Sequence, residues 1–308
     1  MKNTWKIYGI SFALSGAFWG CQQTEEAFQD RKTRENKAEI RQYVSNKGIK
    51  ADSTKSGLFY SIQTTKPNGS KPQIGDEITV QYVAQRLDGV VIDSTLKTNP
   101  SVYIRVPGSG AAGYFFQPVP SLEELLTTGV EKVREGDRVS LFVPWLLRST
   151  TVAVSLLAPL YIPLRYDLEI LKVRSEARQI QDYLVSKKLP KMEINSDSLR
   201  FVKTLLRPDS AQVKVGDEVI VKYTGRLVSN DKVFDSNTTT GLPMTVVDPA
   251  TSNRGGSVVK GFNDGVAKLK YGEKAIVIFP SALGYNTNPK GSIPAYSPLY
   301  FELELVRK

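Results

Sequence analysis

Two long stretches of this chain show the same succession of apolar and polar positions. Each begins with a helical pattern, in which apolar residues recur at i, i+3 and i+4. These residues are Ile40, Tyr43 and Val44 in the first stretch, and Ile180, Tyr183 and Leu184 in the second. Short alternating segments rich in β-branched residues follow and predict strands. One helix-like segment precedes the last strands of each stretch, at 122–126 and 259–269. The pattern predicts an α+β fold with antiparallel sheets, each wrapped on a short helix and preceded by a helical segment.

The two stretches also match in sequence, which indicates an internal repeat. IGDEITVQY at 74–82 corresponds to VGDEVIVKY at 215–223, and YDLEIL at 166–171 corresponds to FELELV at 301–306. We therefore expect two domains joined and preceded by helical segments. The expected segments are a signal peptide over 1–20, a helical linker or stalk over 21–50, a first domain over 51–174, a second helical linker over 175–198 and a second domain over 199–308.

The first 20 residues have the layout of a secretory signal peptide. Lys2 and Lys6 precede an apolar stretch that ends in Gly20-Cys21, after which the chain becomes polar at once. Cys21 is the only cysteine, and its place resembles the acylated cysteine of bacterial lipoproteins, although Phe18 and Trp19 depart from the usual small residues. The sequence predicts lipidation at Cys21 and a place in the cell envelope, at the outer membrane facing the periplasm. The alternative is an ordinary signal peptide with an incidental thiol.

The composition excludes several kinds of catalytic, metal and cross-linked site. The 308 residues include no histidine, which excludes histidine general bases and most zinc sites. A single cysteine excludes an intrachain disulfide. The formal net charge of +10 is scattered rather than gathered in runs, so we expect no nucleic-acid partner.

The second stretch resembles FKBP-type peptidyl-prolyl cis-trans isomerases over 209–308. The resemblance rests on five blocks in order: VGDEVIVKYTGRL, VFDSN, VVKGFNDGVAKLKYGEKA, FPSALGYN and SIPAYSPLYFELEL. It implies an isomerase acting on proline-containing polypeptides without a cofactor or metal. It also places a set of residues in the proline site. The implied catalytic residues are Tyr223, Asp235, Tyr285 and Ile293, and the implied substrate-binding residues are Phe234, Met244, Val258, Val259, Phe262 and Phe301.

Such a site needs no proton chemistry. Rotation about a peptide bond has a barrier of ~18–20 kcal/mol because resonance gives the C–N bond double-bond character. A dry pocket that accepts the twisted amide better than the planar one lowers this barrier. By the resemblance, the Tyr285 hydroxyl and the Ile293 N–H donate hydrogen bonds to the substrate, while Tyr223 pairs with Asp235. Phe262 stands where the family usually has tryptophan.

The first stretch is a degenerate relative. It keeps Tyr82 and Asp93, but Ile92 replaces the aromatic residue before the aspartate and Leu126 stands at the floor position. The block that would carry the donating tyrosine reads VPWLLRST. We therefore expect little or no isomerase activity from this domain. The apolar loop over 150–164 is either a buried hairpin or an exposed flap that binds unfolded clients or a partner.

Together these observations predict an envelope prolyl isomerase that assists the folding of exported proteins. The alternative is a non-catalytic FKBP-like module that serves as a scaffold or holdase.

Overall fold

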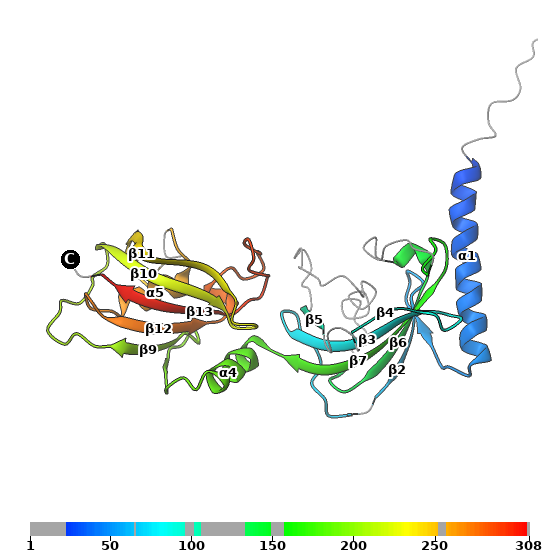
Figure 1. Cartoon of the computed structure of the whole chain (residues 1–308), viewed down its shortest axis with the longest axis horizontal. Coiled ribbons are helices and arrows are strands. Elements are labelled where there is room, and N and C mark those ends of the chain that lie inside the picture. The colour runs from blue at the N-terminus through cyan, green and yellow to red at the C-terminus, as the bar shows by residue number, and fades with distance from the viewer. Residues whose placement is uncertain are drawn as a thin grey trace, which may run out of the picture.

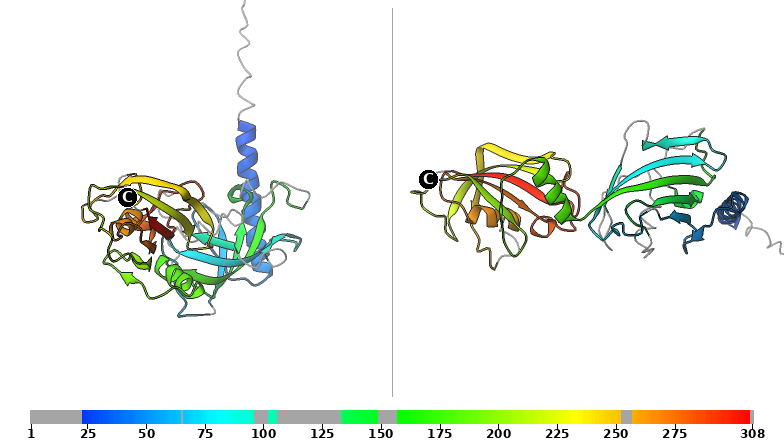
Figure 2. Two further views of the ribbon diagram at one scale, coloured as in Figure 1. Left: turned by 60° about the vertical axis from the view of Figure 1, so that its left-hand side comes forward. Right: turned by 90° about the horizontal axis from the view of Figure 1, so that it is seen from below.

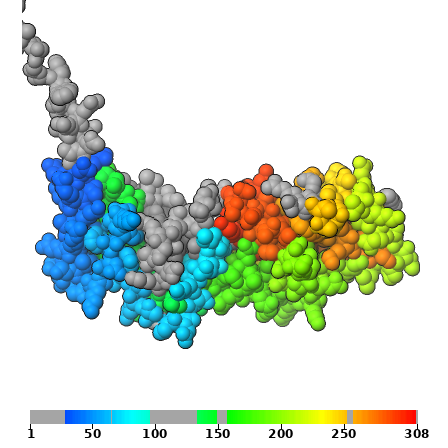
Figure 3. Space-filling view, turned by 180° about the vertical axis from the view of Figure 1, so that it is seen from behind, coloured from blue at the N-terminus to red at the C-terminus, as the bar shows by residue number. Residues whose placement is uncertain are grey.

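The computed structural model describes residues 23–64, 66–95, 102–105, 133–148, 157–251 and 257–306. Two domains lie side by side, with helix α1 (Gln23–Asn46) at the far side of the first (Figures 1 and 2). The space-filling view from behind shows the same elongated arrangement (Figure 3). The predicted signal peptide, Cys21, the helix at 122–126 with Leu126, and residues 150–156 of the apolar loop lie outside the described residues.

The first domain is built on an antiparallel sheet in the order β1-β2-β6-β7-β3-β4, with β5 also paired to β3. A short 3-10 helix, η1 (Trp145–Leu147), follows β6. The strands are β1 (Asp52–Ser53), β2 (Phe59–Gln63), β3 (Glu77–Arg86), β4 (Val91–Ser94), β5 (Val102–Arg105), β6 (Arg138–Val143) and β7 (Leu164–Arg174).

The second domain repeats this plan after helix α4 (Glu176–Ser186). Its sheet has the spatial order β11-β10-β13-β12-β9-β8. Along the chain, α5 (Lys260–Ala267) lies between β11 and β12, and the 3-10 helix η2 (Ser281–Leu283) follows β12. The strands are β8 (Glu193–Ile194), β9 (Arg200–Leu205), β10 (Glu218–Leu227), β11 (Val233–Thr245), β12 (Lys274–Phe279) and β13 (Leu299–Leu305). When the second sheet is read from β8 and the first from β1, the two strand orders are the same. This confirms the predicted α+β class with two antiparallel sheets.

Helix α5 packs directly on the second sheet because two glycines on one of its faces allow close approach. A Cβ at Gly261 would come 2.4 Å from the Phe279 ring, and one at Gly265 would come 3.1 Å from Leu303. The first value is far below ordinary contact, so a larger residue at 261 would push the helix away from β12. The core between helix and sheet therefore depends on these small residues.

The helix before each sheet packs on that sheet's other face. Ile40 of α1 is buried against Phe59 and Phe142. Ile180 of α4 is buried in a cluster with Ile278 and Tyr300. The helices within the two predicted linker segments are thus part of the packed structure. No helix among the described residues is long and apolar enough to span a membrane.

Candidate functional site

Four aromatic rings meet on the inner face of the second sheet, and we call them the aromatic cluster: Tyr223, Phe234, Phe262 and Phe301. The Phe301 ring lies 5.5 Å from Phe234, 5.2 Å from Phe262 and 6.2 Å from Tyr223, between ring centroids. Most of these contacts are edge-to-face, the geometry that aromatic pairs favour. The strands β10, β11 and β13 and the first turn of α5 supply one ring each, so residues far apart in the sequence form one apolar surface.

The predicted pair of Tyr223 and Asp235 is present. The Tyr223 hydroxyl donates a hydrogen bond to the Asp235 carboxylate at 2.6 Å. Burial, and then this bond and the negative charge of Asp235, raise the pKa of the Tyr223 hydroxyl. Burial also raises the pKa of Tyr285, and Asp235 adds to the shift. The charge of Asp235 therefore acts on the pKa values of both hydroxyls, and its carboxylate is hydrogen-bonded to that of Tyr223.

The cluster has a buried floor and a partly exposed rim. Phe262 and Phe301 are 3% and 5% exposed, so they form the floor. The half-buried residues Tyr223, Phe234, Val258, Val259 and Tyr285 pack against the same core. Met244 on β11 is buried in that core. The predicted aromatic and aliphatic site residues therefore all pack in the core of the second domain, where ring contacts bring Tyr223, Phe234, Phe262 and Phe301 together.

The backbone of β10 leaves no room for a side chain beneath this surface. A Cβ at Gly225 would come 2.7 Å from Phe234 and 2.7 Å from Phe301. The glycine is therefore needed to let the two rings close over the strand.

The Ile293 N–H, the predicted donor to a substrate, has an acceptor within the protein. This N–H donates to the Lys290 carbonyl at 2.9 Å, and the Lys290 N–H donates back to the Ile293 carbonyl at 3.0 Å. The small bridge so formed uses both backbone groups of Ile293, whose side chain is buried in the core.

A donor that the sequence reasoning missed is the N–H of Val259. This residue is the N-cap of α5, and none of the described residues accepts a hydrogen bond from its N–H. The first N–H groups of a helix have no intrahelical partner. The expected helix start at residue 259 was the signal that could have identified this donor.

The matching region of the first domain keeps the polar pair but changes its surroundings. The Tyr82 hydroxyl donates to Asp93 at 2.5 Å. Tyr166 occupies the strand position of Phe301, since it faces Ala84 as Phe301 faces Gly225. The Tyr166 hydroxyl is buried and has no hydrogen-bond partner among the described residues. Near the end of η1, Arg148 donates to the carbonyls of residues 159 and 160, and burial lowers the pKa of its guanidinium.

The apolar loop of the first domain is described from residue 157 onward. There Leu157 and Leu160 are exposed, whereas Ala158 is buried. Tyr161 packs edge-on against Phe28 of α1 and against Trp145.

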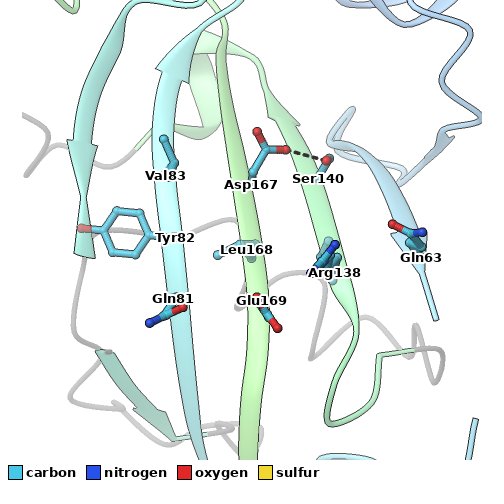
Figure 4. A pocket seen from close by; sticks show the side chains of 10 residues that line it. Gln63, Gln81, Tyr82, Val83, Arg138, Ser140, Asp167, Leu168 and Glu169 are labelled. Carbon is cyan, nitrogen blue, oxygen red and sulfur yellow. Dashed lines mark hydrogen bonds between the residues drawn. The ribbon is translucent and has the colours of Figure 1, made fainter. Parts of the chain in front are cut away.

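A separate hollow of about 370 Å³ lies on the polar face of the first sheet (Figure 4). The side chains of Ser140 and Asp167 point toward one another there, and the Ser140 hydroxyl donates to Asp167 at 2.6 Å. Gln85 and Arg165 also donate to Asp167, so its carboxylate is satisfied within the protein. The second sheet has a hollow of about 330 Å³ at matching strand positions. We attribute both hollows to the shared twist of the sheets.

In the described part of the chain, no group of three or more cysteine, aspartate or glutamate side chains could hold a metal ion.

Comparison with known proteins gives one consistent result. Residues 209–306 match the family described as FKBP-type peptidyl-prolyl cis-trans isomerase. FK506-binding protein 2 of Dictyostelium discoideum is 38% identical over 114 residues, which are 36% of this chain and 80% of that protein. FK506-binding protein 1 of Aspergillus oryzae is 32% identical over 113 residues, 34% of this chain and 94% of that protein.

Other matches cover a smaller share of the related protein. They cover 44%, 57% and 64% of relatives from Gibberella zeae, Podospora anserina and Saccharomyces cerevisiae. Among solved structures, the three FKBP domains of wheat FKBP73 align over 84% of this chain and 98% of that chain, with 21% identity and a TM-score of 0.36.

Proposed function

Because this chain belongs to the FKBP-type peptidyl-prolyl cis-trans isomerase family, we propose that its second domain catalyses rotation about X-Pro bonds in polypeptides. The observation that carries the proposal is the aromatic cluster with the Tyr223–Asp235 hydrogen bond at its rim, against whose core Tyr285 also packs. An apolar surface with a few oriented polar groups at its rim is the usual form of a small binding site.

The proline ring would lie on the floor formed by Phe262 and Phe301, with Phe234 and Val258 at its sides. The barrier to rotation falls when water is excluded and the twisted, less polar amide is preferred over the planar one. The Tyr285 hydroxyl and the Val259 N–H are the donors available to substrate carbonyls, since neither has an acceptor among the described residues. The pair of Tyr223 and Asp235 would hold the tyrosine ring in place at the rim.

The first domain would bind clients or act as a structural partner, with little or no turnover. It keeps the pair of Tyr82 and Asp93, but Ile92 removes an aromatic wall and Tyr166 adds a buried hydroxyl where the second domain has Phe301. The signal pattern and Cys21 support a lipid-anchored role in the cell envelope, where the protein would assist the folding of exported chains.

The test is an exchange assay on a proline peptide with the full chain and with its Tyr285→Phe and Tyr82→Phe variants. The proposal predicts catalysis by the wild type, a loss in Tyr285→Phe and no change in Tyr82→Phe. A folded wild type that leaves the exchange rate at its buffer value would exclude the isomerase. Equal losses in the two variants would show that the first domain also turns over substrate.

A non-catalytic binding module is the second candidate. The occupied N–H of Ile293 and the replacement of tryptophan by Phe262 favour it, because both remove donors that the resemblance implied. A peptide that binds the second domain, broadens the Tyr285 ring signals in NMR and yet exchanges at its uncatalysed rate would support this candidate.

A further inference from the structure

The segment that carries Tyr285 is held by a side chain from outside the second sheet. Glu176, the first residue of α4, accepts hydrogen bonds from the Ser281 N–H and from the Ser281 hydroxyl, both at 2.6 Å. Ser281 begins η2, so its N–H has no partner within that short helix. Since Ser281 is 2% exposed, water does not compete strongly for these bonds.

The first domain contains the same contact at the same position. Asn36 of α1 lies four residues before Ile40, as Glu176 lies four residues before Ile180. The Asn36 side chain accepts a hydrogen bond from the N–H of Trp145, the first residue of η1, at 2.9 Å. Each leading helix thus caps the short 3-10 helix of its own domain, η1 after β6 and η2 after β12. A contact that occurs in both copies is a property of the repeat and not of one loop.

In the second domain this contact fixes the main chain on both sides of Tyr285. The Ser281 carbonyl accepts from the N–H of Gly284 at 2.8 Å and from that of Asn286 at 2.9 Å. The Asn286 carbonyl in turn accepts from the Tyr296 N–H at 2.7 Å. Asn286 and Tyr296 have φ angles of 52° and 54°, a left-handed conformation that non-glycine residues adopt only where the surroundings impose it.

The same helix is tied to the first domain. Asp182 of α4 pairs with Lys172 at 2.8 Å and with Arg174 at 3.4 Å, both near the end of β7. Tyr296 also lies against the first domain, because a Cβ at Gly75 would come 2.9 Å from its ring. The segment from Ser281 to Tyr296, which contains Tyr285, therefore contacts α4 at its start and the turn before β3 at its end.

We propose that Glu176 is a positioning residue for Tyr285, and that α4 is part of the isomerase site rather than a spacer. The inference rests on the proposed function. Glu176 lies outside the aromatic cluster and touches no substrate. It acts by holding Ser281, which sets the main chain from which the Tyr285 hydroxyl reaches the substrate.

The test is a double-mutant cycle in the full chain with Glu176→Ala, Tyr285→Phe and the combination. Loss of a hydrogen bond to a charged group corresponds to about a 10-fold fall in kcat/KM, and we expect it in kcat rather than in KM. If Glu176 acts through Tyr285, Glu176→Ala causes no further fall in the Tyr285→Phe background. Glu176→Gln, which keeps an acceptor oxygen for the Ser281 N–H, should recover part of the rate. Asn36→Ala is the matched control, because it removes the equivalent cap from the first domain and should leave kcat/KM unchanged.

Several outcomes would overturn the proposal: an equal fall in both backgrounds, an unchanged rate in Glu176→Ala, or an equal fall in Asn36→Ala. A readout independent of turnover separates this inference from the proposed function. The ring signal of Tyr285, assigned by its disappearance in Tyr285→Phe, should shift in Glu176→Ala and stay in place in Asn36→Ala. A wild type without activity would refute the proposed function, and a Tyr285 signal that does not move would refute the anchor.

Discussion

Gly225→Ala tests whether the aromatic cluster depends on the bare backbone of β10. The added methyl carbon would lie 2.7 Å from Phe234 and 2.7 Å from Phe301, whereas ordinary contact begins at 3.4 Å. Each ring must therefore retreat by about 0.7 Å, or the strand must move instead. Crowding of this kind costs about 1–3 kcal/mol of stability.

The expected effect on turnover follows from the same displacement. A shift approaching 1 Å in groups that position a substrate can lower the rate by about 100-fold. We therefore expect kcat/KM for a proline peptide to fall by about 10- to 100-fold, while the domain remains folded.

The first domain supplies the control. It has Ala84 at the matching position and Ile92 in place of Phe234, so a methyl group is compatible with the strand when the facing side chain is not a ring. The pair Gly225→Ala with Phe234→Ile should recover stability but not activity, and Ala84→Gly should leave the rate unchanged. Thermal unfolding and the exchange assay measure the two quantities. A Gly225→Ala variant with wild-type stability and rate would refute the reasoning.

Three further predictions concern single side chains. Tyr285→Phe should lower kcat/KM by about 10-fold at unchanged stability, since its hydroxyl has no acceptor among the described residues; a fall in Tm would contradict this. Tyr166→Phe should raise the free energy of unfolding by about 1 kcal/mol, because the buried hydroxyl has no partner in the described part of the chain. Burial raises the pKa of Tyr166 to about 12, against the opposing effect of Arg148. The wild type should therefore lose stability between pH 10 and 12, and the Tyr166→Phe variant should lose less. Parallel profiles of stability against pH in the two proteins would refute this prediction. Burial alone would raise the pKa of Glu273, but Lys203 and two backbone N–H groups lower it. Glu273→Gln should therefore be less stable at pH 7 and lose less stability below pH 4.5, as urea unfolding at several pH values would measure.

The sheets and their duplication were predictable because alternating apolar residues, as in ITVQY at 78–82, leave a strand only one way to bury its inner face. The aromatic site residues were predicted from the resemblance to FKBP-type isomerases, and Tyr223 with Asp235 forms the expected hydrogen bond.

Contacts set by tertiary geometry were not predictable. The Ile293 N–H donates to Lys290 in a bridge that nothing in the sequence pattern indicates. The bond from Glu176 to Ser281 joins residues 105 positions apart, in segments whose helical periodicity gives no indication of a partner. The sequence places Gly225 in a strand, but only the positions of the Phe234 and Phe301 rings show why a glycine is needed there.

The separation between Glu176 and Ser281 has a consequence during synthesis. Helix α4 leaves the ribosome before every strand of the second domain, but the turn that it caps emerges about a hundred residues later. An 11-residue helix is marginal in water by itself, and although the end of β7 already offers ion-pair partners, the apolar partners Ile278 and Tyr300 of α4 emerge later. The nascent chain therefore completes its first domain before α4 can bury its apolar face, and the bond that holds the Tyr285 segment forms near the end of translation.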